Sequence, residues 1–241
     1  MVTKSELKYI QSLSDKKVRL ETGCFIAEGV KLVGEMIAAG YPLKAVYALD
    51  SWESPDASME VNRVEAFELE KMSMLQTPNQ VLAVAMMPQK KEVLNLEGPL
   101  TIVLDGIQDP GNMGTIIRTA DWFGIKQILC SEDTVNCFNS KVIQSSMGSA
   151  FRIPVFYENL TDFLPKLNST IHGALLNGEN LENVDPNEIK ILVMGNEGKG
   201  ISPSLQKHIN QAVTIPGYGQ AESLNVSIAT GIFLHHWSQL K

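Results

Sequence analysis

The sequence is poor in cysteine and has no long apolar run. Its 241 residues include three cysteines and no Cys-x-x-Cys pair, so neither a disulfide framework nor a zinc cluster is expected. No stretch of about 18 apolar residues occurs, which argues against a membrane span. The first residues are mixed and charged, unlike a secretory signal. These absences favour a cytoplasmic protein with reduced thiols and with neither a metal nor a membrane partner.

The chain also lacks an excess of positive charge. Its formal net charge is −7, which argues against a nucleic-acid binder of the usual basic kind. The acids are concentrated, because residues 50–70 hold seven of them and one base. Residues 1–31 instead hold six bases against four acids. Binding of nucleic acid therefore stays open.

The apolar content is sufficient for a packed core. Hydrophobic residues make up 44% of the chain, and its length suits one large domain or two small ones. The strongest boundary is the segment 88–99, which begins and ends with proline. We therefore predict an N-terminal domain over residues 1–88, a linker over 89–98 and a second domain over 99–241.

Strand and helix patterns alternate beyond that boundary. Apolar runs predict strands at 101–105, 126–131, 152–156, 172–177, 189–194 and 213–216. Helical patterns predict helices at 112–123, 140–148 and 223–240. The N-terminal part has the pattern of a smaller α/β unit, with a helix over 29–39 and strands at 43–49 and 81–86. Together these patterns predict an α/β fold whose mostly parallel sheet has helices on both faces.

Three loops in the second part are unusual, and each follows a predicted strand, where open α/β sheets bind ligands. The first loop leads into a helix, for which Asn112 is the predicted N-cap and Gly124 the predicted C-cap. Arg118 falls outside the apolar stripe of this helix and should point away from the core. A helix N-terminus, glycines and a nearby arginine suit an anion such as phosphate. A capped helix with a surface arginine is the alternative.

The second and third loops carry glycines and polar side chains. Three glycines follow Met194 within six residues and allow the backbone to approach a ligand closely. Glu197 among them could accept backbone N–H bonds and make the loop rigid. In the third loop Ser223 is the predicted N-cap of the last helix, which leaves Asn225 in the first turn, a locally unfavourable choice that can mark a function. A flexible loop with a solvated glutamate, and a second capping arrangement, are the alternatives.

Together the three loops, in this order and spacing, resemble the motifs of the SpoU (TrmH-like) branch of the SPOUT RNA methyltransferases. The matching residues are Asn112, Gly114 and Arg118; Gly195, Glu197 and Gly200; and Ile215, Pro216, Ser223, Leu224, Asn225, Ser227 and Ala229. The resemblance covers about residues 99–241. The N-terminal part resembles, more weakly, the family's RNA-binding module, which is similar to a small ribosomal protein.

The resemblance implies methyl transfer from S-adenosyl-L-methionine to a ribose 2′-hydroxyl of RNA. It also implies a homodimer and a deep trefoil knot in the C-terminal chain. The implied cofactor-binding residues are Asn177, Gly195, Gly200, Ile215 and Leu224. Glycines suit this role because adenine and ribose would touch main chain without an intervening Cβ. The implied catalytic residues are Arg118, Asn112, Glu197, Ser223 and Asn225.

The role of Arg118 has two interpretations. The resemblance implies a base, yet a guanidinium has a pKa above about 12 and stays protonated. Either it loses a proton transiently in a cationic site, or it clamps the target phosphate and lowers the energy of the alkoxide. The second interpretation is favoured on energetic grounds. The four histidines of the chain are interpreted as structural or surface residues.

Three further assignments concern the surface and the last helix. The predicted RNA track consists of Lys16, Lys17, Arg19, Arg118 and Arg152. The acidic stretch 50–70 is expected on the face of the first domain turned away from RNA. Apolar residues of the last helix are assigned to the core in preference to a dimer contact: Ile228, Ile232, Phe233, His236, Trp237 and Leu240.

Ribosomal RNA is the default substrate for this two-domain layout, and transfer RNA is the second candidate. The alternative from another class is a non-catalytic RNA-binding protein on the same scaffold. Intact Asn112, Arg118 and Glu197 argue against it. A nucleotide-binding α/β enzyme is disfavoured, because neither G-x-G-x-x-G nor the Walker spacing is present.

Overall fold

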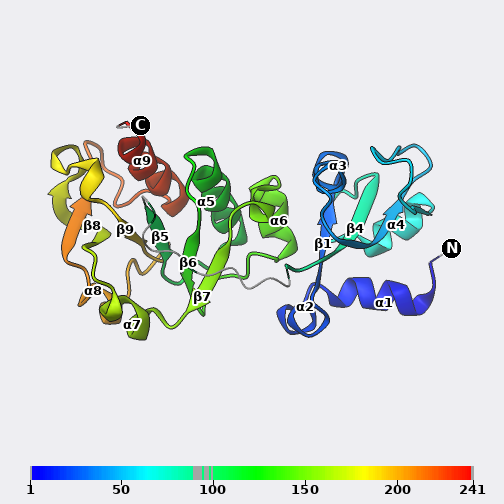
Figure 1. Cartoon of the computed structure of the whole chain (residues 1–241), viewed down its shortest axis with the longest axis horizontal. Coiled ribbons are helices and arrows are strands. Elements are labelled where there is room, and N and C mark those ends of the chain that lie inside the picture. Colours follow the sequence, from blue (N-terminus) through cyan, green and yellow to red (C-terminus); the bar gives the residue numbers. More distant parts are fainter. Residues whose placement is uncertain (1, 89–93, 95–97, 99, 240–241) are drawn as a thin grey trace. The chain divides into compact units, whose positions relative to one another are not determined.

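A computed structural model describes residues 2–88, 94, 98 and 100–239 (Figure 1). The chain divides into two compact units, Met1–Lys91 with Phe138–Gly148, and Glu92–Cys137 with Ser149–Lys241. The predicted linker over 89–98 lies outside the described residues except at positions 94 and 98. Over the described ranges, we find no helix long and apolar enough to span a membrane.

The first unit is built on a mixed sheet with strand order β1-β4-β2-β3. The strands are β1 (Cys24–Glu28), β2 (Leu43–Ala48), β3 (Asn62–Arg63) and β4 (Val81–Met86). Strand β4 runs antiparallel to β1 and β2, and β2 pairs with β3 in parallel. The predicted strands at 43–49 and 81–86 correspond to β2 and β4, whereas β1 was not predicted.

Helices cover both faces of this sheet. They are α1 (Lys4–Ser12), α2 (Lys16–Thr22), α3 (Val30–Ala38) and α4 (Ala66–Met72). Ile10 of α1 and Leu69 of α4 share one core cluster with Leu82. Val33 of α3 lies in a second cluster with Ala83, the neighbour of Leu82 on β4. Both faces of β4 are therefore buried, which explains its continuous apolar sequence.

The segment Phe138–Gly148 carries α6 (Ser140–Ser146) and belongs to the first unit. Its Phe138 ring lies 4.9 Å from that of Phe25, centroid to centroid. Sequence patterns placed this segment in the second domain, because it lies between two of that domain's strands along the chain. The contacts thus divide the chain differently from the order of its elements.

The second unit contains a six-stranded sheet in the order β10-β8-β9-β5-β6-β7. The strands are β5 (Thr101–Leu104), β6 (Ile128–Ser131), β7 (Val155–Glu158), β8 (Ile171–Asn180), β9 (Ile191–Met194) and β10 (Gln211–Thr214). All neighbouring pairs are parallel, which confirms the predicted α/β class. The trefoil knot stays a prediction.

Helices lie on both sides of the parallel sheet. Helix α5 (Pro110–Trp122) lies beside α9 (Val226–Ser238), whereas α7 (Leu160–Phe163) and α8 (Pro203–Gln206) lie on the other side (Figure 1). Leu160 and Leu205 pack in one cluster with Val103 and Val193 of the sheet. Single 3-10 turns complete the unit at Ser149–Phe151, Leu164–Lys166, Leu181–Asn183 and Pro186–Glu188.

The last helix is only partly a core helix. Phe233 and Trp237 are buried as predicted, but Ile228 is 57% exposed and Ile232 is 36% exposed. The core assignment of these two isoleucines is therefore wrong within this chain. His236 is half-buried, and its Nε2 lies 3.0 Å from the Val184 carbonyl oxygen. The prediction for Leu240 lies outside the described residues.

Candidate functional site

The three unusual loops follow β5, β9 and β10. Strands β5 and β9 are direct neighbours, and β8 separates β9 from β10. Because all these strands are parallel, their carboxyl ends lie along the same edge of the sheet. The topology therefore brings the loops together, although more than 100 residues separate the first from the third.

Asn112 is not the N-cap of α5, contrary to the prediction. Helix α5 begins at Pro110, and the Asp109 side chain caps it by accepting the Asn112 N–H over 2.8 Å. Aspartate before a proline at the first helical position favours this start, and that signal was present in the sequence. Asn112 therefore has its side chain available. Its Nδ2 donates to Glu197 Oε1 over 3.0 Å, and its Oδ1 accepts from Asn225 Nδ2 over 3.0 Å.

Asn225, rather than Ser223, is the N-cap of α9. Its Oδ1 accepts the Ser227 N–H over 2.9 Å and the Ile228 N–H over 3.4 Å. Asparagine is among the best N-cap residues, so the unfavourable first-turn position predicted for it does not exist. Ser223 lies two residues before the cap and is exposed. The cap leaves the Asn225 amide group free to donate to Asn112.

Glu197 joins the second loop to the first. Its carboxylate accepts from the backbone N–H groups of Gln108 (3.5 Å) and Asp109 (3.3 Å), besides Asn112. The prediction that this carboxylate binds backbone N–H groups is confirmed, but the donors belong to the first loop. The negative charge lies at the N-terminus of α5, where the helix dipole stabilises it.

The glycines of the second loop are required by the loop itself. Asn196 and Gly200 exchange two backbone hydrogen bonds of 3.0 and 2.9 Å, and Gly200 has a φ of +68°. A Cβ on Gly195 would lie 2.2 Å from the Gly200 carbonyl carbon. The chain's own hairpin thus accounts for both glycines, without the ligand contact that the sequence argument used.

Arg118 lies apart from this hydrogen-bond network. It is exposed between the buried residues Ile117 and Ala120, so it points away from the core as predicted. Six residues of helix separate it from Asn112, which is about 9 Å along the axis and about 240° around it. Within the described residues the structure gives it no hydrogen bond or ion pair. Its guanidinium is therefore available to a ligand or a second chain.

Three of the residues expected to bind the cofactor lie in, or directly after, neighbouring strands. Asn177 lies in β8, Gly195 follows β9 and Ile215 follows β10. The Thr214 hydroxyl donates to the Leu176 carbonyl over 3.1 Å and joins the third loop to β8. Leu176 is 71% exposed and Leu224 is 48% exposed. Exposed apolar side chains beside main-chain groups fit a cofactor with an adenine ring.

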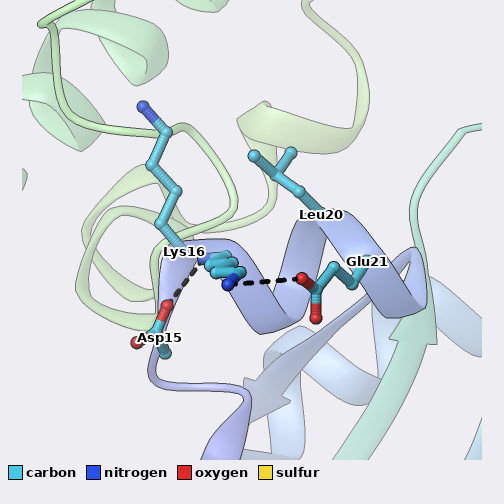
Figure 2. A pocket seen from close by; sticks show the side chains of 5 residues that line it. Asp15, Lys16, Leu20 and Glu21 are labelled. Atoms are coloured by element: carbon cyan, nitrogen blue, oxygen red, sulfur yellow. Dashed lines mark hydrogen bonds and ion pairs between the residues drawn. The ribbon is translucent and has the colours of Figure 1, made fainter.

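The N-terminal part of the expected RNA track is only partly accessible. Lys16 and Lys17 are exposed on α2. Together with Leu20 of the same helix they line a shallow hollow (Figure 2). Lys17 Nζ lies 3.9 Å from Glu21 Oε1. Arg19 is 3% exposed, and its Nη1 donates to the carbonyl oxygens of Leu13 and Ser14. The assignment of Arg19 to the track is therefore wrong, because this side chain holds the turn between α1 and α2.

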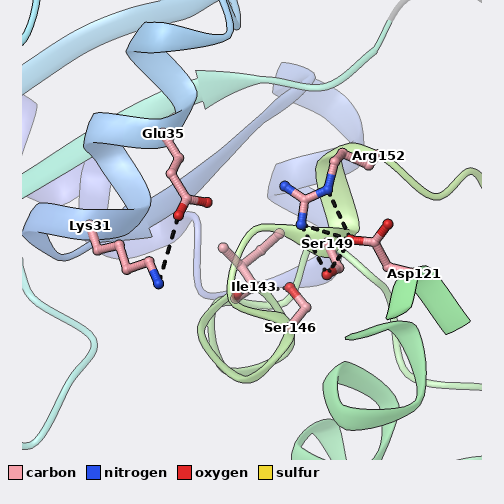
Figure 3. A network of polar contacts seen from close by, with 7 residues as sticks. All are labelled: Lys31, Glu35, Asp121, Ile143, Ser146, Ser149 and Arg152. Carbon is pink, nitrogen blue, oxygen red and sulfur yellow. Dashed lines mark hydrogen bonds and ion pairs between the residues drawn. The ribbon is translucent and has the colours of Figure 1, made fainter. Parts of the chain in front are cut away.

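Arg152 is exposed but already paired. Figure 3 shows its guanidinium directed at Asp121 and Ser149, with Nε 2.9 Å and Nη2 2.7 Å from Asp121 Oδ2. Ser149 also donates to Asp121 over 2.8 Å. In this ion pair two guanidinium nitrogens share one carboxylate oxygen, and the pair joins the end of α5 to the segment before β7. Contact with RNA would have to compete with it.

No histidine lies in the hydrogen-bond network. His172 is completely buried in β8, and burial lowers its pKa. His208 follows α8, and His235 is exposed on α9. In the described part of the chain, no group of three or more histidine, cysteine or acidic side chains could hold a metal ion.

Sequence reasoning missed two residues of the site. Asp109 caps α5, and Asn196 contacts both its own loop and Gly106. The Asp109-Pro110 step in the sequence indicates the cap by Asp109. No local pattern distinguishes the second, because its main partner is 90 positions away.

Comparison with known families assigns both parts of the chain. Residues 99–235 match the SpoU rRNA methylase family. Residues 4–83 match the MRM3-like substrate binding domain. The segment from 99 to 235 contains all three loops of the site.

Among individual proteins, the chain is 32% identical to the 23S rRNA (guanosine(2553)-2′-O)-methyltransferase RlmP of Bacillus subtilis, over 96% of this chain and 95% of that one. It is 36% identical to an RNA methyltransferase of the TrmH family from Porphyromonas gingivalis, with a TM-score of 0.87 over 100% of both chains. The AdoMet-bound rRNA methyltransferase of Sinorhizobium meliloti is 28% identical, with a TM-score of 0.83 over 100% of this chain and 96% of that chain.

Proposed function

Because the chain belongs to the SpoU rRNA methylase family, we propose that it transfers a methyl group from S-adenosyl-L-methionine to a ribose 2′-hydroxyl of ribosomal RNA. One structural observation supports this proposal most strongly. Hydrogen bonds from Asn112 to Glu197 and from Asn225 to Asn112 join all three motif loops at the ligand-binding edge of the sheet. The RlmP relative is named for the same reaction on a guanosine of 23S rRNA.

Asn177, Gly195, Gly200, Ile215 and Leu224 are the residues that we propose to hold S-adenosyl-L-methionine. The bound cofactor would supply a methyl group carried on a sulfonium sulfur, and the neutral thioether left behind is a good leaving group. The protein therefore has to align the ribose oxygen with that methyl group and make loss of the hydroxyl proton less costly. The linked loops suit alignment, since a hydrogen-bonded network holds its side chains in one arrangement.

Arg118 is the proposed residue for the charge that develops on the ribose oxygen. Its guanidinium stays protonated, so it acts as a clamp on the target phosphate and stabilises the developing alkoxide. The hydroxyl proton then passes to a phosphate oxygen or to water. The exposure of Arg118 and its lack of a partner among the described residues support this role. Asn112 and Asn225 hold the first and third loops beside the reacting ribose, and Ser223 lies near the end of the third loop, two residues before the N-cap of α9.

We also propose a homodimer. Trp122 lies four residues after Arg118 and thus on the same face of α5, and it is 85% exposed. On the neighbouring helix α9, Ile228 and Ile232 are exposed as well. Burial of these side chains against a second copy would bring Arg118 to the interface, close to a site of the partner subunit.

For the N-terminal unit we propose a contact with RNA through Lys16 and Lys17. Both are exposed on α2, and the unit matches a substrate binding domain. Reversing both charges should weaken RNA binding at low salt and make it less sensitive to salt. A filter-binding titration over a range of salt concentrations measures this. Equal affinities and equal salt slopes of the two proteins would contradict the proposal.

The free cysteines bear on where the protein acts. The three cysteines are free and buried, which suits the reducing cytoplasm where we propose that the protein acts.

The decisive experiment for the proposed methyl transfer uses ribosomal and transfer RNA from a strain that lacks the gene. Incubation with labelled S-adenosyl-L-methionine should modify ribosomal RNA at a ribose, located by mass spectrometry of nuclease fragments. Labelling of transfer RNA alone, or of neither RNA, would contradict the proposed function.

A further inference from the structure

The carboxamide of Asn196 uses every hydrogen-bonding position that it has. Its Oδ1 accepts from the backbone N–H groups of Gly198 and Lys199, both over 3.0 Å. Its Nδ2 donates to the Gly106 carbonyl oxygen over 2.6 Å and to Glu197 Oε2 over 3.3 Å. An asparagine side chain offers two acceptor and two donor positions, and all four are filled here.

These contacts determine which way the amide group faces. Exchange of its oxygen and nitrogen would direct an oxygen at the Gly106 carbonyl and at the Glu197 carboxylate, which are both acceptors. It would also direct an NH₂ group at two N–H donors. The surrounding groups thus specify one orientation, and only a side chain with both functions at this length satisfies them.

Asn196 connects the end of β5 to the rest of the site. Gly106 lies two residues after the end of β5 and belongs to the first loop, whereas Asn196 and Glu197 belong to the second. From Glu197 the chain of hydrogen bonds continues to Asn112 and from there to Asn225, the N-cap of α9. Glu197 is therefore held by Asn196 on one carboxylate oxygen while it binds Asn112 through the other.

We propose that Asn196 is a positioning residue for methyl transfer: its carboxamide fastens the second loop to the first and orients Glu197 toward Asn112. This inference rests on the proposed function. Asn196 touches neither RNA nor cofactor in this scheme, and it acts through Glu197 and Asn112. Displacement of reacting groups by about 1 Å can lower a rate about 100-fold, so loss of this fastening should lower kcat.

The substitution Asn196→Asp separates the two functions of the side chain. It keeps an oxygen that can accept from Gly198 and Lys199, but it removes both donors. At pH 8 the introduced carboxylate would face the Gly106 carbonyl and Glu197, so kcat should fall about tenfold or more. The KM for the cofactor should change less than kcat, because the backbone bonds between Asn196 and Gly200 that shape this loop do not involve the Asn196 side chain.

A pH profile distinguishes positioning from a purely structural role. The neighbouring carboxylate disfavours ionisation of the introduced group, and when protonated it can again donate one hydrogen bond. The ratio of variant to wild-type kcat should therefore rise as the pH falls from 8 to 6. The matched control is Asn168→Asp, the same chemical change at an exposed position in the connection before β8, which should leave kcat unchanged.

Asn196→Ser provides a second variant, because a serine hydroxyl can still accept from the turn but is too short to reach Gly106. Amide hydrogen exchange at residues 108–112 supplies a readout independent of activity, and it should increase in both Asn196 variants but not in Asn168→Asp. Unchanged kcat and exchange in both Asn196 variants would overturn the inference. So would a kcat loss in Asn196→Asp that is the same at every pH. A wild-type protein that methylates no RNA would instead overturn the proposed function, and the exchange measurement would still test the positioning.

Discussion

Asn225 donates its Nδ2–H to Asn112 Oδ1 over 3.0 Å, and this bond joins the N-cap of α9 to the first turn of α5. The two residues are 113 positions apart in the chain. Asn225 also caps its own helix, and Asn112 also binds Glu197 of the second loop. The Asn225 side chain thus stabilises α9, and with Asn112 it assembles the candidate site.

The double task of Asn225 can be separated by substitution. Asn225→Ala should destabilise the protein by about 1 kcal/mol, because an N-cap is lost, and should also lower kcat. Asn225→Asp keeps an acceptor for the Ser227 N–H but cannot donate to Asn112, so it should keep stability and lower kcat. Urea unfolding and methyl-transfer rates measured on both variants test this. Full activity of Asn225→Asp would show that the bond to Asn112 is dispensable.

Substitution of Arg118 tests the phosphate clamp. Arg118→Ala should lower kcat about 100-fold or more, because the guanidinium stabilises charge only in the transition state. Calorimetric affinity for S-adenosyl-L-methionine should not change, since Arg118 lies outside the residues proposed to hold it. A folded Arg118→Ala protein with near-wild-type transfer would refute both the clamp and the base interpretation.

The dimer is tested at Trp122. Trp122→Glu places a charge on the exposed face of α5 and should shift the protein from dimer to monomer in light-scattering measurements. Transfer activity should fall with the loss of the dimer, while the far-UV circular dichroism spectrum stays the same. Phe67→Glu is the matched control, because it makes the same change of charge at another exposed aromatic side chain, in the first unit. A wild-type protein that is monomeric at micromolar concentration would contradict the proposal.

Two glycines offer a matched pair for the backbone argument. Gly195→Ala places a Cβ 2.2 Å from the Gly200 carbonyl carbon, so the second loop must rearrange and cofactor binding should be lost. Gly217→Ala meets no atom within 4 Å and should be tolerated. Melting temperature and calorimetry with S-adenosyl-L-methionine distinguish the two. Equal behaviour of the variants would show that close packing of the backbone does not explain the glycine at 195.

Buried His172 predicts a pH dependence of stability. Burial lowers its pKa below the usual histidine value of about 6.5, so the unfolded chain binds more protons than the folded one as the pH falls through that value. The free energy of unfolding should therefore be highest above about pH 6.5 and should decrease as the pH falls toward 5.5. Urea unfolding at pH 7.5 and 5.5 measures the decrease, which should be smaller in His172→Leu. An equal decrease in both proteins would assign the effect to other groups.

The sequence by itself determined the class of the fold and predicted a candidate site at one edge of its sheet. Apolar runs such as TIVL and ILVM predict buried parallel strands, because both faces of such strands are covered. Polar and glycine-rich loops directly after them predict a site at the carboxyl edge of the sheet. The fold class is predictable because hydrophobic periodicity acts locally. The three loops meet because parallel strands end at the same edge of the sheet.

Only the tertiary structure decided what individual side chains do. Arg19 and Lys17 are both basic residues on α2, yet one is buried against backbone carbonyls and the other is exposed. Asn112 was expected to cap a helix and instead links two loops, because Asp109 satisfies the N–H groups of that helix. Asn196 gave no signal, since its main partner is 90 positions away. Burial and long-range hydrogen bonds depend on neighbours that are distant in sequence, and only folding brings these neighbours into contact.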